Sequence, residues 1–527
     1  MKKLFKLLSG IKEVFILMGK TIGSYSTKEK ISSLIVVILI AIIVLPPILR
    51  DERLTSVTNE TDTGNEMLYA EGLVGEITHL NPVFTEFNEV DQDISSLIFS
   101  GLSKYDPDEG KVVEDIATHT LSEDYKTYTF TLKNNIYWHD GVEVTAEDVY
   151  FTYHDVIQST DFQNPILRAN FESVQVEMVD SRTVTFTLER TNSFFFTYTT
   201  VGLLPKHILG DVPISELDTH EFNKNPIGTG PYKVSGPYEE VADNEQVVEL
   251  ELFPDYYGKK SSITSIRFHT FPDMETLLAN EGQWHGIARI PEYMLMEAQT
   301  DRLSAEQTGY KTTIDTPLLE LNQDDWIHQS SQEQAMGALY DEGWELNADG
   351  IRENEDGETL TLRLIRRTFD NEKQEKIAAT TAEVIKTQLE TIGIEVIVEA
   401  YDSQAIQSKI ETRDYDLLLY GQNLGYNLDT YSYWHSSQAT EYGLNLSNYR
   451  NPNADALIER IRSTFDQDTK DELLNELAEI IEEDIPAIFL YTPSYYFLVD
   501  EKVQGIELED LRFPSDRFAQ ISDWYLN

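Results

Sequence analysis

The sequence predicts a mixed α/β protein of two or three lobes that follows one N-terminal transmembrane helix. The chain has 527 residues, which is more than one ordinary domain contains. Residues 128–132 and 183–188 alternate polar and apolar side chains, as half-buried strands do. Residues 374–392 have the apolar spacing of a helix that ends at Gly393 before a strand, a unit typical of parallel sheets. Residues 31–49 carry no charge and predict the membrane helix.

The uncharged run at 31–49 predicts an uncleaved membrane anchor. Its length corresponds to about 28 Å of helix, enough for the hydrocarbon core. Because residues 1–30 are Lys-rich, they are expected to stay cytoplasmic while the rest of the chain is exported. They form either an amphipathic helix on the membrane or a plain leader. A cleaved signal peptide is the alternative, although no A-x-A site follows the run. The polar residues 50–65 predict a linker.

The clearest local pattern follows the strand at 128–132. A second strand is predicted at Ile136–Trp138, and Asp140-Gly141 predicts a tight turn. Trp138 and His139 are interpreted as structural residues of this hairpin. Thr145, with an acid three residues later, predicts a capped helix N-terminus.

Other elements are predicted from apolar periodicity and from turn residues. Strands are predicted at 67–70, 360–364, 394–398, 414–420 and 487–491, and helices at 94–102 and within 457–481. The Asp-Gly pairs at 349–350 and 356–357 predict two β-turns. A calcium loop is the alternative reading, but its twelve-residue spacing is not met.

Composition excludes several classes of site and partner. Acidic residues outnumber basic ones by 92 to 41, and the net charge of -51 disfavours nucleic acid and anionic lipid as partners of the body. The chain has no cysteine, so disulfides, thiolate metal sites, cysteine nucleophiles and a lipidated cysteine are excluded. The 28 tyrosines indicate either ligand recognition or simply sheet-rich packing.

No motif indicates catalysis. The sequence has no G-x-S-x-G elbow, phosphate-binding loop or H-E-x-x-H pair, and its ten histidines show no helical metal-ligand spacing. The sequence therefore predicts a protein that is not an enzyme and that has no cofactor and no metal site.

Four collinear segments carry a resemblance to a known family. They are Ala117–Tyr153 with its Trp-His-Asp-Gly and Thr-Ala-x-Asp-Val motifs, Pro226–Lys233 (PIGTGPYK), Asp414–Gly421 (DYDLLLYG) and Asn448–Leu490. In this order they resemble the large extracytoplasmic solute-binding proteins, family 5, that serve peptide, dipeptide and nickel ABC importers. The resemblance covers most of residues 66–527, and the first segment is its most specific part.

The resemblance implies a periplasmic-binding-protein-like clamp of two lobes with an additional small domain. Lobe I is expected to combine residues 66–94, 222–317 and 488–527. The accessory domain is expected at 95–221, inserted in lobe I, and lobe II at 318–487. The stretch between Thr312 and Trp344 is shorter than is usual in the family, so lobe II is expected to be shortened.

The resemblance implies the substrate-binding subunit of an ABC importer that captures oligopeptides or dipeptides between its lobes. The expected partners are the peptide, an ABC permease with its ATPase subunits, and the membrane through the N-terminal helix. The protein is expected at the cell membrane as a single-pass chain with an extracytoplasmic body. A membrane-tethered sensor or scaffold that keeps the clamp without a transport ligand is the alternative.

The ligand-binding residues implied by the resemblance lie in two loops. They are Phe84, Glu86, Gln422, Asn423, Gly425, Tyr426, Asn427, Asp429 and Trp434. The family usually has Trp where this chain has Gln422, and the acid that pairs with the peptide's α-amino group falls on Gly425. Either Asp429 takes that role through a shifted loop, or the protein does not read a free peptide N-terminus.

Overall fold

The computed structural model divides the chain into two units, residues 1–66 and Met67–Asn527. It describes residues 67–162, 164–242, 244–280, 284–291, 294, 312–313, 329–369, 372–421, 425–426, 429–441, 443–490, 494–508 and 511–527. The predicted cytoplasmic segment, anchor and linker lie outside the described residues. Within the described ranges, no helix has the length and apolarity needed to cross a membrane.

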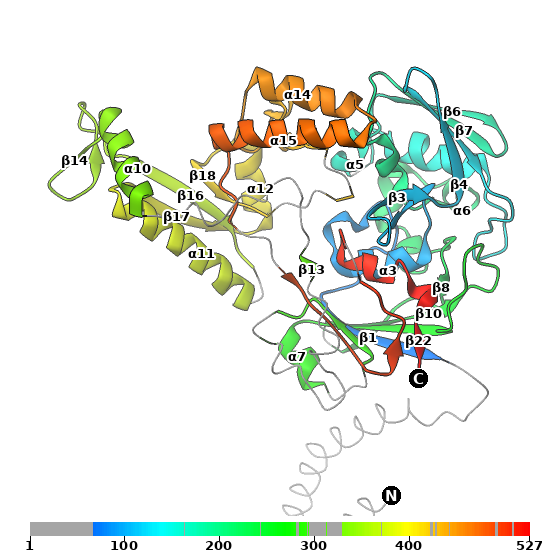
Figure 1. Ribbon diagram of the computed structural model, residues 1–527. Helices are drawn as coiled ribbons and strands as arrows, with labels where there is room; N and C mark the ends of the chain where they lie inside the picture. Colours follow the sequence, from blue (N-terminus) through cyan, green and yellow to red (C-terminus); the bar gives the residue numbers. More distant parts are fainter. Residues whose placement is uncertain are drawn as a thin grey trace, which may run out of the picture. The chain divides into compact units, whose positions relative to one another are not determined.

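The largest described sheet of the body is a mixed sheet of seven strands (Figure 1). Its strands are β1 (Leu68–Val74), β8 (Tyr232–Val234), β9 (Glu239–Ala242), β10 (Glu245–Leu252), β11 (Ser265–Phe271), β12 (Gly286–Ala288) and β20 (Phe497–Val499). The order is β20-β12-β1-β11-β10-β8, with β9 also on β10. Strand β1 runs parallel to both β11 and β12. The sheet thus joins strands from three separated stretches of the chain.

A second, four-stranded antiparallel sheet has the order β4-β5-β7-β6. Its strands are β4 (Ala117–Leu121), β5 (Thr127–Leu132), β6 (Val174–Asp180) and β7 (Thr183–Leu188). The predicted strands at 128–132 and 183–188 are confirmed, because their alternation places Phe130 and Phe186 in an aromatic core. The hairpin β2 (Ser103–Asp106) and β3 (Lys111–Glu114) precedes this sheet.

The segment around Trp138 differs in part from the prediction. Residues 136–138 do not form a strand; a single bridge joins Tyr137 to Glu143. The strand does not form because Trp138 N–H donates to Val142 O at 2.8 Å, and this bond turns residues 138–142 into a tight loop. The structural role predicted for Trp138 and His139 is confirmed. Trp138 is fully buried, and His139 bonds through its two ring nitrogens to Gly228 N and Gly230 O.

Burial lowers the pKa of His139 to about 4, so its imidazole is neutral at pH 7. A neutral ring with its proton on Nε2 can accept from Gly228 N–H and donate to the Gly230 carbonyl at the same time. Gly228 must be glycine here, since an added Cβ would lie 1.9 Å from Ile98 O. The histidine therefore fixes the Gly228–Gly230 loop against the end of helix α3 (Glu89–Ile98).

The predicted helix start at Thr145 is confirmed for α4 (Ala146–Tyr150), which continues as the π-helical turn Phe151–Ile157. Thr145 Oγ1 accepts from Glu147 N, and Asp148 Oδ2 accepts from Thr145 N at 2.9 Å. Replacing Thr145 by Ala is expected to lower the free energy of unfolding by about 1 kcal/mol, because it leaves a helix-end N–H without its partner. Urea unfolding of the full-length protein measures this change. Thr145→Ser, which keeps the hydroxyl, should stay close to wild type; an equal loss in both variants would contradict the capping role.

A third sheet contains three parallel strands, β16 (Thr361–Arg367), β17 (Glu395–Tyr401) and β18 (Leu417–Leu419). The predicted helix–Gly–strand unit is confirmed, because α11 (Glu372–Thr391) leads through Gly393 at φ +89° into β17. The two predicted turns are also confirmed, with Gly350 N bonded to Asn347 O and Gly357 N to Asn354 O. Strand β18 is shorter than predicted and only half-buried.

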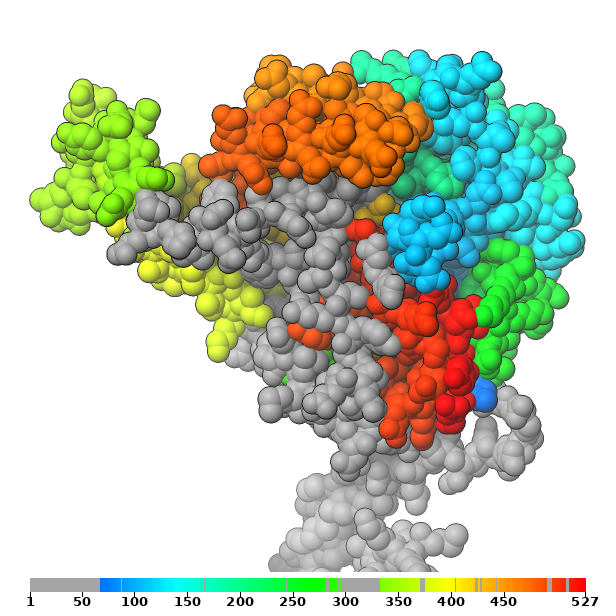
Figure 2. Space-filling view, viewed as in Figure 1, coloured from blue at the N-terminus to red at the C-terminus, as the bar shows by residue number. Residues whose placement is uncertain are grey.

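Two helices follow, α14 (Pro452–Ser463) and α15 (Gln467–Asp484), where the sequence predicted one or two helices within 457–481. Their apolar faces, including Leu473, Leu474 and Leu477, share a core with Phe194 from the 95–221 stretch. The backbone N–H of Ser193 also donates to Arg462 O. Figure 2 shows this helix pair in orange beside the cyan surface of that stretch.

Two predicted elements are wrong in their extent or type. The helix predicted at 94–102 spans Glu89–Ile98 instead, because the Asn88 side chain accepts from Val90 N and Asp91 N and starts it earlier. The strand predicted at 487–491 is absent from the described residues 487–490. Ile488, Phe489 and Leu490 are 66%, 39% and 40% exposed there, so the apolar run covers surface and pairs with no strand.

The remaining described elements are helices, 3-10 helices and two-residue strands. The helices are α5 (Pro165–Ala169), α6 (Lys206–Leu209), α7 (Met274–Ala279), α10 (Gln329–Asp341), α12 (Ser403–Thr412) and α13 (Tyr431–Trp434). The 3-10 helices are η2 (Thr85–Phe87), η4 (Phe195–Thr200), η5 (Ile214–Thr219), η6 (Glu221–Asn223), η10 (Ser436–Gln438), η11 (Pro514–Phe518) and η12 (Ile521–Asp523). The two-residue strands are β13 (Thr312–Thr313), β14 (Glu345–Leu346), β15 (Arg352–Glu353), β19 (Ser494–Tyr495), β21 (Val503–Gln504) and β22 (Tyr525–Leu526).

Candidate ligand-binding site

The loop after β18 holds most of the predicted ligand-binding residues. Gln422, Asn423 and Asn427 lie outside the described residues. Gly425 has a positive φ of +66°, and a Cβ added there would contact Phe513 Cζ at 3.4 Å. The ring of Phe513 therefore borders the space that a side chain at position 425 would need. A left-handed backbone and this close neighbour both favour glycine.

Tyr426 is engaged by the protein itself. Its hydroxyl donates to Asp516 Oδ1 at 2.8 Å. Its ring stacks on Tyr105 with centroids 4.9 Å apart and meets the edge of Phe513 at 4.8 Å. Burial raises the pKa of Asp516 to about 6, although its other oxygen accepts the backbone N–H groups of Arg512 and Phe513. Tyr426 thus connects the 425–429 loop to the C-terminal segment.

Asp429 is likewise held inside the protein. Its Oδ2 accepts from the Tyr198 hydroxyl at 2.5 Å and lies 3.2 Å from Arg462 Nε. The side chain is 6% exposed, and the Arg462 guanidinium also covers the Tyr431 ring. Because Asp429 already has a cationic partner, a ligand ammonium would have to compete with Arg462 for it.

The three other predicted residues lie on different elements. Phe84 is half-buried against His79 and Phe162, and exposed Glu86 accepts from Asn164 Nδ2 at 2.8 Å. Trp434, at the end of α13, meets the ring edges of Tyr449 and Phe489. The described contacts do not bring Phe84 and Glu86 together with the 425–434 residues. A shallow surface hollow lined by Met336, Tyr340 and Arg352, among others, contains none of the predicted residues.

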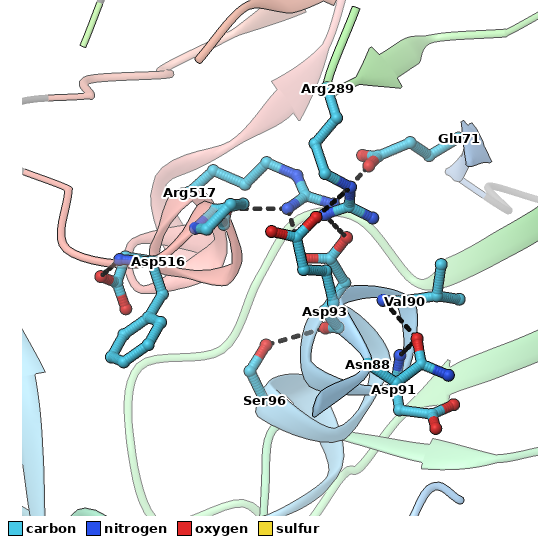
Figure 3. Close-up of polar contacts among 12 residues, drawn as sticks. Glu71, Asn88, Val90, Asp91, Asp93, Ser96, Arg289, Asp516 and Arg517 are labelled. Atoms are coloured by element: carbon cyan, nitrogen blue, oxygen red, sulfur yellow. Dashed lines mark hydrogen bonds and ion pairs between the residues drawn. The ribbon is translucent and has the colours of Figure 1, made fainter. Parts of the chain in front are cut away.

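A buried ionic cluster was missed by the sequence analysis (Figure 3). Arg517 in η11, fully buried, donates to Asp93 Oδ1 at 2.7 Å and to Glu71 Oε1 at 2.5 Å. Arg289, directly after β12, lies 2.6 Å from Asp93 Oδ2. The Tyr69 hydroxyl donates to Glu71 Oε2 at 2.6 Å. The cluster joins β1, α3, β12 and the C-terminal segment.

The electrostatics of the cluster are dominated by burial and by the two guanidiniums. Desolvation raises the pKa of Glu71. Arg289 and Arg517 outweigh burial at Asp93 and lower its pKa. Among the described residues, no group of three or more His, Asp or Glu side chains could hold a metal ion. The side chains of the cluster can form hydrogen bonds and ion pairs, but they do not include a nucleophile beside a general base, as a catalytic site would.

The comparisons with known proteins agree on one family. Residues 111–326 match the model of bacterial extracellular solute-binding proteins, family 5 middle. The oligopeptide-binding protein AppA of Bacillus subtilis is 26% identical over 522 residues, 86% of this chain and 91% of that protein. The dipeptide-binding protein of Escherichia coli is 22% identical over 74% of this chain and 82% of that protein.

Solved structures show the same fold. AppA from Bacillus subtilis in complex with a nonapeptide has a TM-score of 0.67 at 25% identity, and it covers 87% of this chain and 99% of that one. The substrate-binding protein CtaP from Listeria monocytogenes has a TM-score of 0.66 at 23% identity, over 88% and 100%. These relatives are named as binding proteins, which confirms the prediction that the chain is not an enzyme.

Proposed function

We propose that this chain, which belongs to the family 5 extracellular solute-binding proteins, captures oligopeptides or dipeptides between two lobes and delivers them to an ABC permease and its ATPase subunits. The observation that carries the proposal is the similarity to AppA of Bacillus subtilis, which extends over 86% of the chain and includes the fold of its nonapeptide complex. The family supplies no catalytic step, so the protein's function is binding and release.

The proposed lobe I combines residues 66–94, 222–317 and 488–527. The seven-stranded sheet supports this division, because all of its strands come from these three stretches. The proposed accessory domain, 95–221, contains the four-stranded sheet, and the proposed lobe II, 318–487, contains the three parallel strands. The chain passes between the proposed lobes near β13 and β19, which pair with each other.

The proposed ligand contacts remain those predicted from the sequence, except that Gly425 and Asp429 are given a different role. Gln422, Asn423 and Asn427 are proposed to bind the ligand main chain, with Phe84, Glu86, Tyr426 and Trp434 beside it. Gly425 offers no carboxylate, and Asp429 is neutralised by Arg462. We therefore propose that neither residue reads a free peptide α-amino group. The ligand would then be held by hydrogen bonds that are indifferent to its N-terminus.

The proposed location is the outer face of the cell membrane. The support comes from the sequence, in which the uncharged run 31–49 follows a Lys-rich segment. The linker at 50–65 would hold the acidic body away from the lipid surface.

A thermal-shift titration of the full-length protein tests the function. Di- to penta-peptides and a mixed nonapeptide pool, each free and N-acetylated, are the ligands. A ligand at a hundredfold excess over its Kd stabilises by about 2.7 kcal/mol, and we expect free and acetylated forms to raise the Tm equally. A shift with free peptides alone would contradict the proposed indifference to the N-terminus.

A sensor or scaffold without a transport ligand is the second candidate. Tyr426 already bonds to Asp516, and Asp429 already pairs with Arg462. Because these two predicted ligand-binding side chains have partners within the protein, their contacts favour this second candidate. In that case no peptide pool would change the Tm.

A further inference from the structure

Arg289 occupies an unusual backbone position at the end of β12. Its φ is +58°, in the left-handed region that a residue with a Cβ rarely adopts. Strain of this kind is retained where the surrounding structure holds it, most often at functional positions. β12 runs parallel to β1, so Arg289 lies at the carboxyl end of adjacent parallel strands. Ligands of open α/β sheets bind outside these strand ends.

Several buried donors of this cluster have no hydrogen-bond acceptor within the described part of the chain; Arg517 Nε is one, and two others belong to Arg289 and Tyr495. Of these two, one is Nη2 of Arg289, whose side chain is 15% exposed. The other is the hydroxyl of Tyr495, a residue that is 6% exposed and lies on β19. Arg289, Arg517, Asp93 and Glu71 are the charged neighbours of that hydroxyl, which therefore lies within the ionic cluster. A buried donor without an acceptor costs free energy, so it indicates an acceptor that arrives with a ligand.

The charge of the cluster decides the chemistry of that acceptor. Arg289 and Arg517 contribute two positive charges, and Glu71 and Asp93 contribute two negative ones. Glu89, 3.4 Å from Arg289 Nε, adds a further negative charge at the rim. Among these described charges, no positive one is left to compensate a carboxylate, so the acceptor that fits is neutral. In a peptide it is a main-chain carbonyl oxygen.

We infer that Arg289 and Tyr495 donate hydrogen bonds to a main-chain carbonyl oxygen of the bound peptide, at the carboxyl end of β12 and beside the β13–β19 pair. The inference rests on the proposed peptide-binding function and assigns two ligand-binding residues to it. Asp93 pairs with Arg289 Nη1, and the ligand carbonyl supplies the acceptor that Nη2 lacks within the described residues.

The variant Tyr495→Phe tests the inference because it removes one hydroxyl and no bond within the described residues. Peptide affinity of the full-length protein is measured by titration with the nonapeptide pool, and stability by the Tm without peptide. We expect the Kd to rise about two- to tenfold while the Tm without peptide stays equal or rises. Arg289→Lys, which keeps the charge beside Asp93 but removes Nη2, is expected to raise the Kd about tenfold.

Tyr232→Phe is the matched control. Tyr232 is fully buried on β8 of the seven-stranded sheet, and its hydroxyl donates to Ile263 O at 2.9 Å. Its loss leaves a carbonyl without its donor, so the Tm should fall while the Kd stays at the wild-type value. The two tyrosine variants are therefore expected to show opposite patterns in Tm and Kd.

The outcomes separate the inference from the proposed function. If wild type binds peptides and Tyr495→Phe binds them equally well, the inference is overturned and the function stands. If Tyr495→Phe weakens peptide acids but not C-terminally amidated peptides, the acceptor is a carboxylate and the inference of a neutral acceptor is overturned. If wild type binds no peptide, both fail together.

Discussion

Replacing Arg517 by methionine is expected to lower the free energy of unfolding by about 3–5 kcal/mol, the cost of removing one partner from a buried ion pair. Arg517 is fully buried and pairs with two carboxylates, Asp93 and Glu71, whose side chains are themselves fully buried. Without the guanidinium, the side-chain partners left within the described residues are the Tyr69 hydroxyl for Glu71 and Arg289 for Asp93. Because methionine preserves most of the apolar volume of the arginine side chain, the loss in the free energy of unfolding measures the cost of the uncompensated carboxylate charge.

The matched control for this prediction is Arg267→Met. Arg267 pairs with Glu249 across β11 and β10, but both side chains are partly exposed. Exposed pairs contribute about 0–1 kcal/mol, so this variant should unfold close to wild type in urea. The double variant Arg517→Met with Glu71→Gln should recover part of the loss, since it removes one orphaned charge. Equal effects of Arg517→Met and Arg267→Met would contradict a dominant role for burial.

Asp516 is expected to make the protein less stable as the pH rises from about 4 to 6. Burial raises the pKa of its carboxyl from 3.8 to about 6. In this range the folded state binds more protons at this group than the unfolded state does, so the free energy of unfolding falls with rising pH. The accumulated loss at pH 7 is about 3 kcal/mol, at 1.36 kcal/mol for each pKa unit.

The variant Asp516→Asn removes this dependence and keeps the hydrogen bonds. An asparagine can accept the N–H groups of Arg512 and Phe513 with Oδ1 and donate to the Tyr426 oxygen with Nδ2. The Tm of wild type should therefore fall relative to Asp516→Asn between pH 4 and 7. Asp466→Asn is the control, because contacts with Thr469 lower the pKa of Asp466 below 3.8; wild type and this variant should therefore keep a nearly constant difference in Tm between pH 4 and 7, and wild type should lose stability relative to it only at more acid pH. Parallel Tm curves for wild type and Asp516→Asn would contradict the raised pKa.

The parts of the fold that depend on short-range patterns were predicted from the sequence. The cap at Thr145 is determined within four residues, and the strand at 183–188 by its own alternation. The strand predicted at 136–138 failed because a backbone bond from Trp138 to Val142 closes a loop there, and alternation does not encode that bond. The apolar run at 487–490 has the composition of a strand, but it pairs with no strand in the described residues and its side chains Ile488, Phe489 and Leu490 stay exposed.

The candidate site shows the same limit. The resemblance identified Gly425 as the position where the family has its acidic residue. Nothing near Gly425 in the sequence indicates that Phe513 borders the space that a side chain at this position would need. Asp93 and Arg517 are 424 residues apart, so no local pattern could have paired them. Tyr495 and Arg289 likewise belong to elements that only the folded sheet brings together.

The order of the cluster residues along the chain has a consequence for the order in which the protein matures. Arg517 is synthesised 424 residues after Asp93 and 446 residues after Glu71, the two carboxylates that share it. Until Arg517 has emerged, Glu71 lacks its guanidinium partner and Asp93 lacks one of its two, so both carboxylates favour the hydrated, open chain. Strand β20, which flanks β12, also arrives late. Completion of the main sheet therefore waits for β20 and Arg517, and a chain that stops before them leaves an unfinished body for quality-control proteases to remove.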